Sequence, residues 1–149
     1  MTTGANGLPV SPALFVALFA IAFPLFWIAI SGLIASMGWR GLAASYAATS
    51  DPPLSARRIR FASLRIGDSL RAANYGSCID GWVTQSGLWL RPFLFFRPFH
   101  PMLFLPWARI EAVSEEKRFM SSYVRVRLAG DVPDLLLRGA LGRAVFDRK

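Results

Sequence analysis

Few side chains in this sequence have the types and spacing that catalysis or metal binding requires. His100 is the one histidine and has no acid or nucleophile beside it, whereas acid–base catalysis needs a reacting group within about 3 Å. Cys78 is the one cysteine, so His100 and Cys78 fall short of the three or four ligands of a metal site. Glu115 and Glu116 lie in a charged run that we interpret as exposed. We therefore predict no catalytic residue, no metal site and no cofactor, and a structural role for His100.

The charged residues of the sequence are predominantly basic. It has 17 Lys and Arg against 9 Asp and Glu, a net charge of +8, and every charged residue follows residue 39. Such a domain is attracted to anionic surfaces, and each basic residue close to an anionic leaflet contributes about 1 kcal/mol. We expect anionic lipid rather than nucleic acid, because the aromatic residues fall mainly at positions expected in the core. The candidate lipid or partner contacts are Arg57, Arg58, Arg60, Arg97, Arg125 and Arg127.

Two readings of these arginines remain open. Those at positions 57, 58 and 60 either form a solvated basic segment that sets membrane topology or bind anionic lipid directly, since both roles use the same residues. Arg125 and Arg127 alternate with apolar residues on one predicted strand. They either extend the basic surface or pair across strands with Glu111, Glu115 or Glu116.

The segment Phe93–Trp107 is unusually rich in Phe and Pro. It predicts either two buried strands joined by a turn at Arg97–Pro101 or a loop that enters the lipid headgroup layer. In the second case its Phe side chains would bury apolar area while Arg97 reaches phosphate. A groove for a partner protein is a third alternative.

These groups follow an apolar segment, Ala13–Met37, that carries no charged residue. As a helix it reaches about 37 Å, enough to cross a hydrocarbon core of about 30 Å. Ser11 and Pro12 suit a helix start, and Pro24 is expected to kink the helix. A cleaved signal peptide is disfavoured, because the apolar run is long and no Lys or Arg precedes it.

The flanks of this segment predict its orientation. No charged residue precedes it and arginines follow it, so the positive-inside rule places the N-terminus outside and the C-terminal domain in the cytoplasm. Trp39 and Arg40 are expected at the membrane interface as anchors. Small residues near the end of the span either have no special role or let another membrane helix approach closely. They are Ser31, Gly32, Ala35 and Ser36.

Beyond the span we predict a mainly β domain of six or seven short strands, forming a bent antiparallel sheet or partial barrel. Tyr123–Leu128 is the clearest strand, because apolar and polar side chains alternate. Ser69–Gly76 is predicted as a loop or an irregular edge, and Ser114–Ser122 as a loop. Leu135–Arg138 is predicted as the last strand, and Gly139–Arg148 as a short closing helix. The predicted divisions are an extracytoplasmic tail (1–12), a transmembrane helix (13–37), a juxtamembrane helix with a Pro-containing linker (38–54) and the β domain (55–149).

Three motifs follow one another in residues 75–130: GWVT at 81–84, GLWL at 87–90, and LPW at 105–107 with Ile110 and Val113. This order resembles bacterial pleckstrin-homology-like and GRAM-type domains. The resemblance implies a seven-stranded, strongly bent sheet closed by a C-terminal helix, in a small membrane protein of the bacterial inner membrane. It also implies binding or scaffolding rather than catalysis.

Two functional hypotheses follow. In the first, the chain is a non-enzymatic, membrane-anchored binding or scaffold module whose basic domain lies at the inner-membrane surface against anionic lipid. In the alternative, it is an accessory subunit of a larger integral-membrane complex and docks through its transmembrane helix, with Pro24, Trp27 and the small residues in the contact. A membrane-tethered enzyme would need a polar pocket with convergent titratable groups, which we do not expect.

Overall fold

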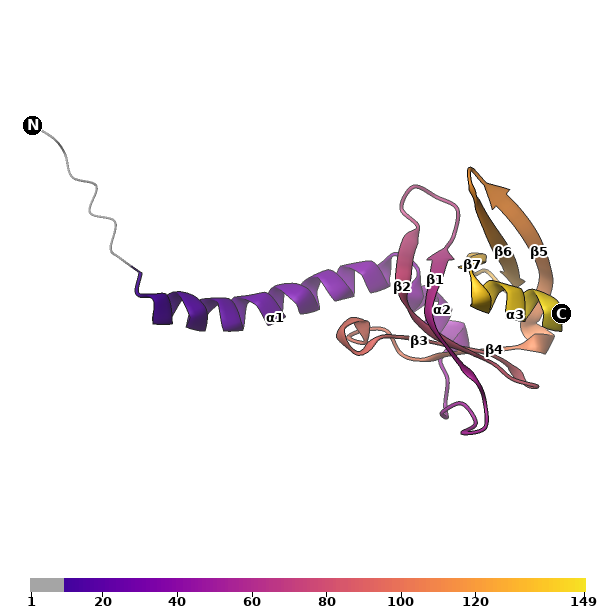
Figure 1. Cartoon of the computed structure of the whole chain (residues 1–149), viewed down its shortest axis with the longest axis horizontal. Helices are drawn as coiled ribbons and strands as arrows, with labels where there is room; N and C mark the ends of the chain where they lie inside the picture. Colours follow the sequence, from indigo (N-terminus) through magenta and orange to yellow (C-terminus); the bar gives the residue numbers. More distant parts are fainter. Residues whose placement is uncertain (1–9) are drawn as a thin grey trace, which may run out of the picture. The chain divides into compact units, whose positions relative to one another are not determined.

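The computed structural model describes residues 10–149, so most of the predicted N-terminal tail lies outside the described residues. The chain divides into two compact units, one ending at Ile30 and one spanning Ser31–Lys149. We call the second unit the sheet unit. It holds the sheet and the two shorter helices of the described chain (Figure 1).

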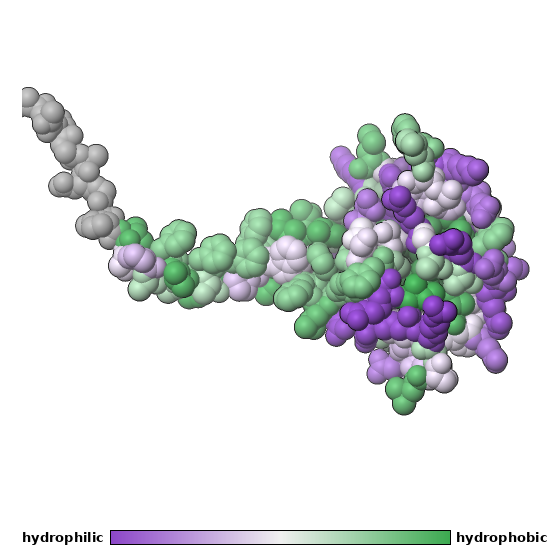
Figure 2. Space-filling model, viewed as in Figure 1, coloured by the Kyte–Doolittle hydropathy of each residue, from purple (hydrophilic) through white to green (hydrophobic). Residues whose placement is uncertain are grey.

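The predicted apolar helix is present as α1, Pro12–Ser36. Its start is capped as expected, since the Leu14 backbone N–H donates to Ser11 Oγ at 3.2 Å. Pro24 lies inside it, and Phe19, Phe23 and Trp27 stack in succession at 5.4 and 6.3 Å between ring centroids. Figure 2 shows hydrophobic residues over most of the visible face of α1. Within the described chain, it is the one helix long and apolar enough to cross a membrane.

The sheet unit contains seven antiparallel strands in the order β4-β3-β2-β1-β7-β6-β5. They form a curled half-barrel followed by a short C-terminal helix, which confirms the predicted fold class. The strands are β1 Arg58–Ile66, β2 Ala73–Val83, β3 Gly87–Pro92, β4 Leu103–Pro106, β5 Ile110–Arg118, β6 Ser121–Leu128 and β7 Leu135–Arg138. Two 3-10 turns, η1 Leu94–Phe96 and η2 Trp107–Arg109, flank β4.

Two helices complete the core of the sheet unit. The C-terminal helix α3, Ala140–Arg148, lies against the sheet and buries Leu141 and Val145 completely (Figure 1). It approaches β2 so closely that a Cβ at Gly81 would lie 2.6 Å from the Leu141 methyl carbons. The helix α2, Trp39–Tyr46, adds buried side chains and is joined to β4 by a bridge between Ala47 and Leu103. The predicted juxtamembrane segment therefore shares one core with the sheet.

Two predicted loops are in part strands. Ser114–Ser122 was predicted to be a loop, but β5 continues to Arg118 and β6 begins at Ser121, with only Phe119 and Met120 between them. The charged residues there belong to two paired strands that leave many side chains in solvent. Similarly, β2 begins at Ala73 rather than after Gly76, because its first residues pair with the end of β1.

Candidate functional site

An exposed apolar loop lies between β3 and β4. We define the apolar loop as residues 93–99, which include η1. Leu94 is 67% exposed, Phe95 75% and Phe99 49%. The segment Phe93–Trp107 thus divides in two: the apolar loop presents its side chains outward, whereas Leu103 and Leu105 of β4 are fully buried.

The apolar loop is seated against the C-terminal end of α1. Two ring carbons of Phe99 lie 3.3 Å from the position that a Cβ on Gly32 would occupy, so glycine permits this close contact. The Arg40 guanidinium lies over the same ring, 5.5 Å from its centroid. Phe99 has a φ of 62°, an uncommon value for a bulky residue. Gly32 and Arg40 therefore both contact this ring.

A buried polar cluster anchors the residues that follow the loop. The Trp39 indole N–H donates to the Pro101 carbonyl at 2.9 Å, and its ring packs edge-on against Tyr75 and His100. His100 is 3% exposed; its Nε2 lies 2.9 Å from the Tyr75 hydroxyl and its Nδ1 lies 2.8 Å from the Pro98 carbonyl. His100 is thus buried, with both ring nitrogens hydrogen-bonded. Trp39 differs from the predicted interfacial anchor, because its indole is fully buried in this cluster.

Arg58, Arg60 and Arg91 lie near a buried carboxylate on the face of β1, β2 and β3, and Arg97 of the apolar loop lies near Arg91. We call Arg58, Arg60, Arg91 and Arg97 the arginine cluster. Arg58 forms an ion pair and hydrogen bond with Asp80, which is fully buried, and Arg60 Nε lies 4.0 Å from the other Asp80 oxygen. Burial lowers the pKa of Arg91, and the nearby charges of Arg97 and Arg58 lower it further. The charges of Asp80 and Asp51 oppose this shift, so two carboxylates lie near these arginines.

Aromatic rings join the arginine cluster to the apolar loop. The guanidinium groups of Arg58 and Arg91 lie over the Trp82 ring, 5.6 and 5.2 Å from its centroid. Arg60 lies over Phe61 and Phe93 at 5.4 and 6.0 Å, and these two rings meet edge-on at 5.2 Å. Since Phe93 begins the apolar loop, the cluster and the loop are continuous. Together we call them the contact face.

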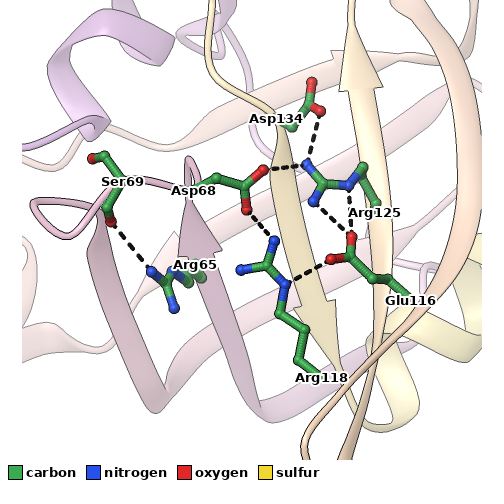
Figure 3. Close-up of polar contacts among 7 residues, drawn as sticks. All are labelled: Arg65, Asp68, Ser69, Glu116, Arg118, Arg125 and Asp134. Carbon is green, nitrogen blue, oxygen red and sulfur yellow. Dashed lines mark hydrogen bonds and ion pairs between the residues drawn. The ribbon is translucent and has the colours of Figure 1, made fainter.

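A second group of charges is neutralised within the sheet unit. Arg125 of β6 contacts carboxylate oxygens of Asp68, Glu116 and Asp134 at 2.7, 2.6 and 3.0 Å (Figure 3). Arg118 bridges Asp68 and Glu116 from β5 at 2.7 and 2.6 Å. Of the two alternatives for Arg125, the structure shows the pairing with glutamate, extended by two aspartates. We therefore leave Arg125 out of the contact face.

This ion network predicts an acid-sensitive stability. The hydrogen bonds from Arg125 and Arg118 hold the pKa values of Asp68 and Glu116 below their ordinary 3.8 and 4.5. A lowered pKa in the folded state adds stability that is present above the ordinary value and is lost as the pH falls through the folded value. We expect Arg125→Met to move acid unfolding to higher pH, as followed by near-ultraviolet circular dichroism.

Arg127→Met is the matched control for this prediction, because Arg127 lies two residues along the same strand and is exposed. It removes the same charge without touching the network. Equal acid midpoints in the two variants would contradict the role assigned to Arg125.

The remaining predicted residues lie apart from the contact face or beside it. Arg57 lines an open groove of about 710 Å³ between the segment preceding β1, the β2–β3 turn and α3. Arg148 of α3 lines the same groove. Of the small residues near the end of α1, Ser31 and Ala35 are buried within the sheet unit and Ser36 is exposed. Within residues 10–149, no three His, Cys, Asp or Glu side chains lie close enough to hold a metal ion.

Sequence reasoning missed Asp80 and Arg91 as members of this site. Both are single charged residues inside apolar runs, and their meeting depends on the pairing of Asp80 with Arg91 between β2 and β3. Comparisons of this chain with protein families, with curated proteins and with solved structures gave no match. The site is therefore interpreted from its own geometry.

Proposed function

We propose that this chain is a membrane-anchored, non-enzymatic binding module whose contact face touches anionic lipid at the surface of the membrane that α1 spans. In this proposal α1 crosses the bacterial inner membrane and the sheet unit lies on the cytoplasmic side, as the arginines after the span favour. The sheet unit would be a relative of pleckstrin-homology-like domains. Its seven-stranded curled sheet and C-terminal helix are compatible with that relationship.

The observation that carries the proposal is the contact between the apolar loop and the C-terminal end of α1. Phe99 packs on Gly32, a residue of the last turns of α1. If α1 spans the bilayer, those turns lie where the hydrocarbon gives way to headgroups, and the loop lies at the same level. Exposed Leu94 and Phe95 are then next to lipid rather than water.

The arginine cluster supports the same proposal through its charge. Arginine binds phosphate with a planar set of donors, and cations beside an apolar insertion are typical of proteins that lie on anionic membranes. Arg60 contacts Phe93 of the loop, Arg97 belongs to the loop, and both side chains are exposed, so they are placed to reach headgroup phosphates. Each is expected to contribute about 1 kcal/mol, or about fivefold in the contact equilibrium, at low ionic strength.

The alternative of a subunit that docks through its helix is less favoured. Two of the four small residues predicted to pack against another membrane helix, Ser31 and Ala35, are already buried inside the sheet unit. A second helix would find only part of this face exposed. We therefore retain the lipid-contact proposal.

The proposal can be tested on the full chain in lipid nanodiscs. Cys78→Ala removes the native thiol, and Leu94→Cys then places an environment-sensitive fluorophore on the apolar loop. We expect lipids carrying a quencher in the headgroup region to quench this probe several-fold more than a probe at Met120→Cys, which lies at the fully exposed β5–β6 turn. Phosphatidylglycerol should increase the quenching over phosphatidylcholine alone.

Two further measurements sharpen this test. Arg60→Gln together with Arg97→Gln should remove most of the increase caused by phosphatidylglycerol, while Arg127→Gln should not. Salt near 1 M should act like the double substitution, since the screening length falls from about 10 Å at 0.1 M to about 3 Å. Equal quenching at positions 94 and 120 in every lipid would overturn the proposal.

A further inference from the structure

Two hydrogen bonds fix the tautomer of the neutral His100 ring. The Pro98 carbonyl can only accept, so Nδ1 must carry a hydrogen and donate to it. In a neutral imidazole Nε2 is then an acceptor, and the Tyr75 hydroxyl donates to it. Both ring nitrogens are thus satisfied in the neutral form, in a place where the side chain has almost no access to water.

A second proton on His100 would conflict with the Tyr75 hydroxyl and with Arg40. Nε2 would become a donor and meet the Tyr75 hydroxyl, whose own hydrogen would then need another acceptor inside the core. Tyr75 remains uncharged because burial raises its pKa, and burial also raises the pKa of Cys78 on the same strand. From α2, Arg40 adds repulsion. The groups that face the imidazole therefore offer it no negative charge.

The residues linked to His100 are those that hold the apolar loop. Its backbone N–H donates to the Arg97 carbonyl at 2.9 Å, and its neighbour Phe99 is the ring seated on Gly32. The next residue, Pro101, accepts the Trp39 hydrogen bond. A change at His100 thus acts directly on the contact between the loop and the end of α1.

We propose that His100 is a proton-operated latch: in its neutral form it holds the apolar loop against the end of α1, and its protonation releases the loop. This inference rests on the proposed function for its biological meaning, since it describes how the lipid-contacting loop is regulated. Release detaches Phe99 from Gly32 and exposes His100 to water, which stabilises the imidazolium. The released loop then moves freely between water and the headgroup layer.

The sign of the pH dependence follows from linkage. Burial, the largest cause, and Arg40 lower the pKa of the seated His100 from the ordinary 6.5, although the Pro98 carbonyl opposes them. A released, solvated His100 binds its proton more tightly than the seated one, so falling pH favours release. An anionic surface attracts protons and so lowers the local pH. Anionic lipid and acid therefore act in the same direction.

The test uses the full chain in nanodiscs, with the probe at Leu94→Cys in the Cys78→Ala background. Probe anisotropy reports loop mobility, and the imidazole NMR signal reports protonation; His100 is the one histidine of the sequence, so the assignment is direct. We expect the anisotropy to fall as the pH is lowered below 6.5. The midpoint of this fall should equal the midpoint of the imidazole titration. Phosphatidylglycerol should raise both midpoints relative to phosphatidylcholine.

Two substitutions separate a latch from a merely structural residue. His100→Gln keeps an acceptor for Tyr75 but cannot titrate, so the loop should stay seated at every pH. Tyr75→Phe removes the donor to the neutral ring and should shift the imidazole midpoint toward 6.5, a change that remains measurable if His100→Gln fails to fold. A midpoint unchanged by Tyr75→Phe, or an anisotropy transition that persists in a folded His100→Gln variant, would overturn the latch.

The failure of this inference is distinguishable from the failure of the proposed function. Anisotropy and NMR report the latch in phosphatidylcholine, where electrostatic lipid contact is absent, whereas quenching by lipid reports the contact itself. Quenching at position 94 with a pH-independent anisotropy would retain the lipid contact and reject the latch. The reverse pattern would retain the latch and reject the lipid contact.

Discussion

Trp39→Ala is expected to destabilise the sheet unit by about 3–5 kcal/mol, the usual cost of truncating a large aromatic side chain in a core. Trp39 is fully buried, it packs on Tyr75 and His100, and its N–H satisfies the Pro101 carbonyl. The substitution leaves a cavity and an unpaired carbonyl at the same point. Since a domain of this kind has a total stability of about 5–15 kcal/mol, the loss should be plain in thermal unfolding of the full chain in detergent.

Two control variants test the cause of this loss. Trp39→Phe keeps most of the ring but removes the hydrogen bond, so it should lie between the wild type and Trp39→Ala. Leu54→Ala changes a fully exposed side chain and should leave the unfolding temperature unchanged. A Trp39→Ala variant that unfolds with the wild type would mean that α2 is not part of the sheet core.

Trp39→Phe also connects the stability of the sheet unit with its proposed function. Trp39 holds the Pro101 end of the segment that carries the apolar loop. A probe at Leu94→Cys should therefore be more mobile in Trp39→Phe than in the wild type at neutral pH, even where the unit remains folded. This links the juxtamembrane helix to the contact face through one hydrogen bond.

The elements predicted best from the sequence are those that one local pattern determines. An uncharged run long enough to span a bilayer predicts α1 to within a residue at each end. Alternation of apolar and basic residues predicts the strand at Tyr123–Leu128, which in the structure is β6 extended by two residues. The last strand, Leu135–Arg138, is confirmed with the same bounds.

The elements that were missed lack a local signal. The β5–β6 turn consists of Phe119 and Met120, with a φ of 52° at Phe119, where a two-residue hairpin turn ordinarily has Gly or Asn. The charged run Glu115–Arg118 before it completes the appearance of a loop. Only the pairing of the two strands, from Arg118 with Ser121 onward, makes this segment a hairpin.

The contact face was predictable only in part, for a related reason. The basic residues and the Phe-rich segment are visible in the sequence, and both were candidates for lipid contact. Their meeting depends on the pairing of Arg58 with Trp82 and of Asp80 with Arg91, which brings three strands together. The burial of Trp39 likewise depends on α2 folding back onto β4, which the composition of that segment does not indicate.

Asp80→Ala is expected to change stability and lipid contact in opposite directions. Asp80 is fully buried and binds Arg58, so its loss should lower stability by about 1.5–3 kcal/mol, as for a hydrogen bond to a charged group. This loss of stability is less than the roughly 3–5 kcal/mol that breaking a fully buried ion pair costs. The reason is that the side chains of Arg58 and Arg60 are 39% and 58% exposed and remain hydrated.

Loss of the same carboxylate leaves the arginine cluster with one more uncompensated positive charge. Contact with phosphatidylglycerol should therefore strengthen by about fivefold at low salt, from about 1 kcal/mol for a charge near an anionic leaflet. Quenching of the Leu94→Cys probe in nanodiscs measures this change, and Asp80→Asn, which keeps the shape of the side chain, should reproduce it with a smaller loss of stability.

The matched control is Asp131→Ala, which removes one negative charge from an exposed loop between β6 and β7. If net charge alone governed lipid contact, Asp131→Ala would strengthen quenching as much as Asp80→Ala does. We expect a clear difference, because the Asp80 carboxylate neutralises arginines of the contact face itself. Equal effects would show that the arginine cluster contributes only to the overall charge and has no local role at the membrane surface.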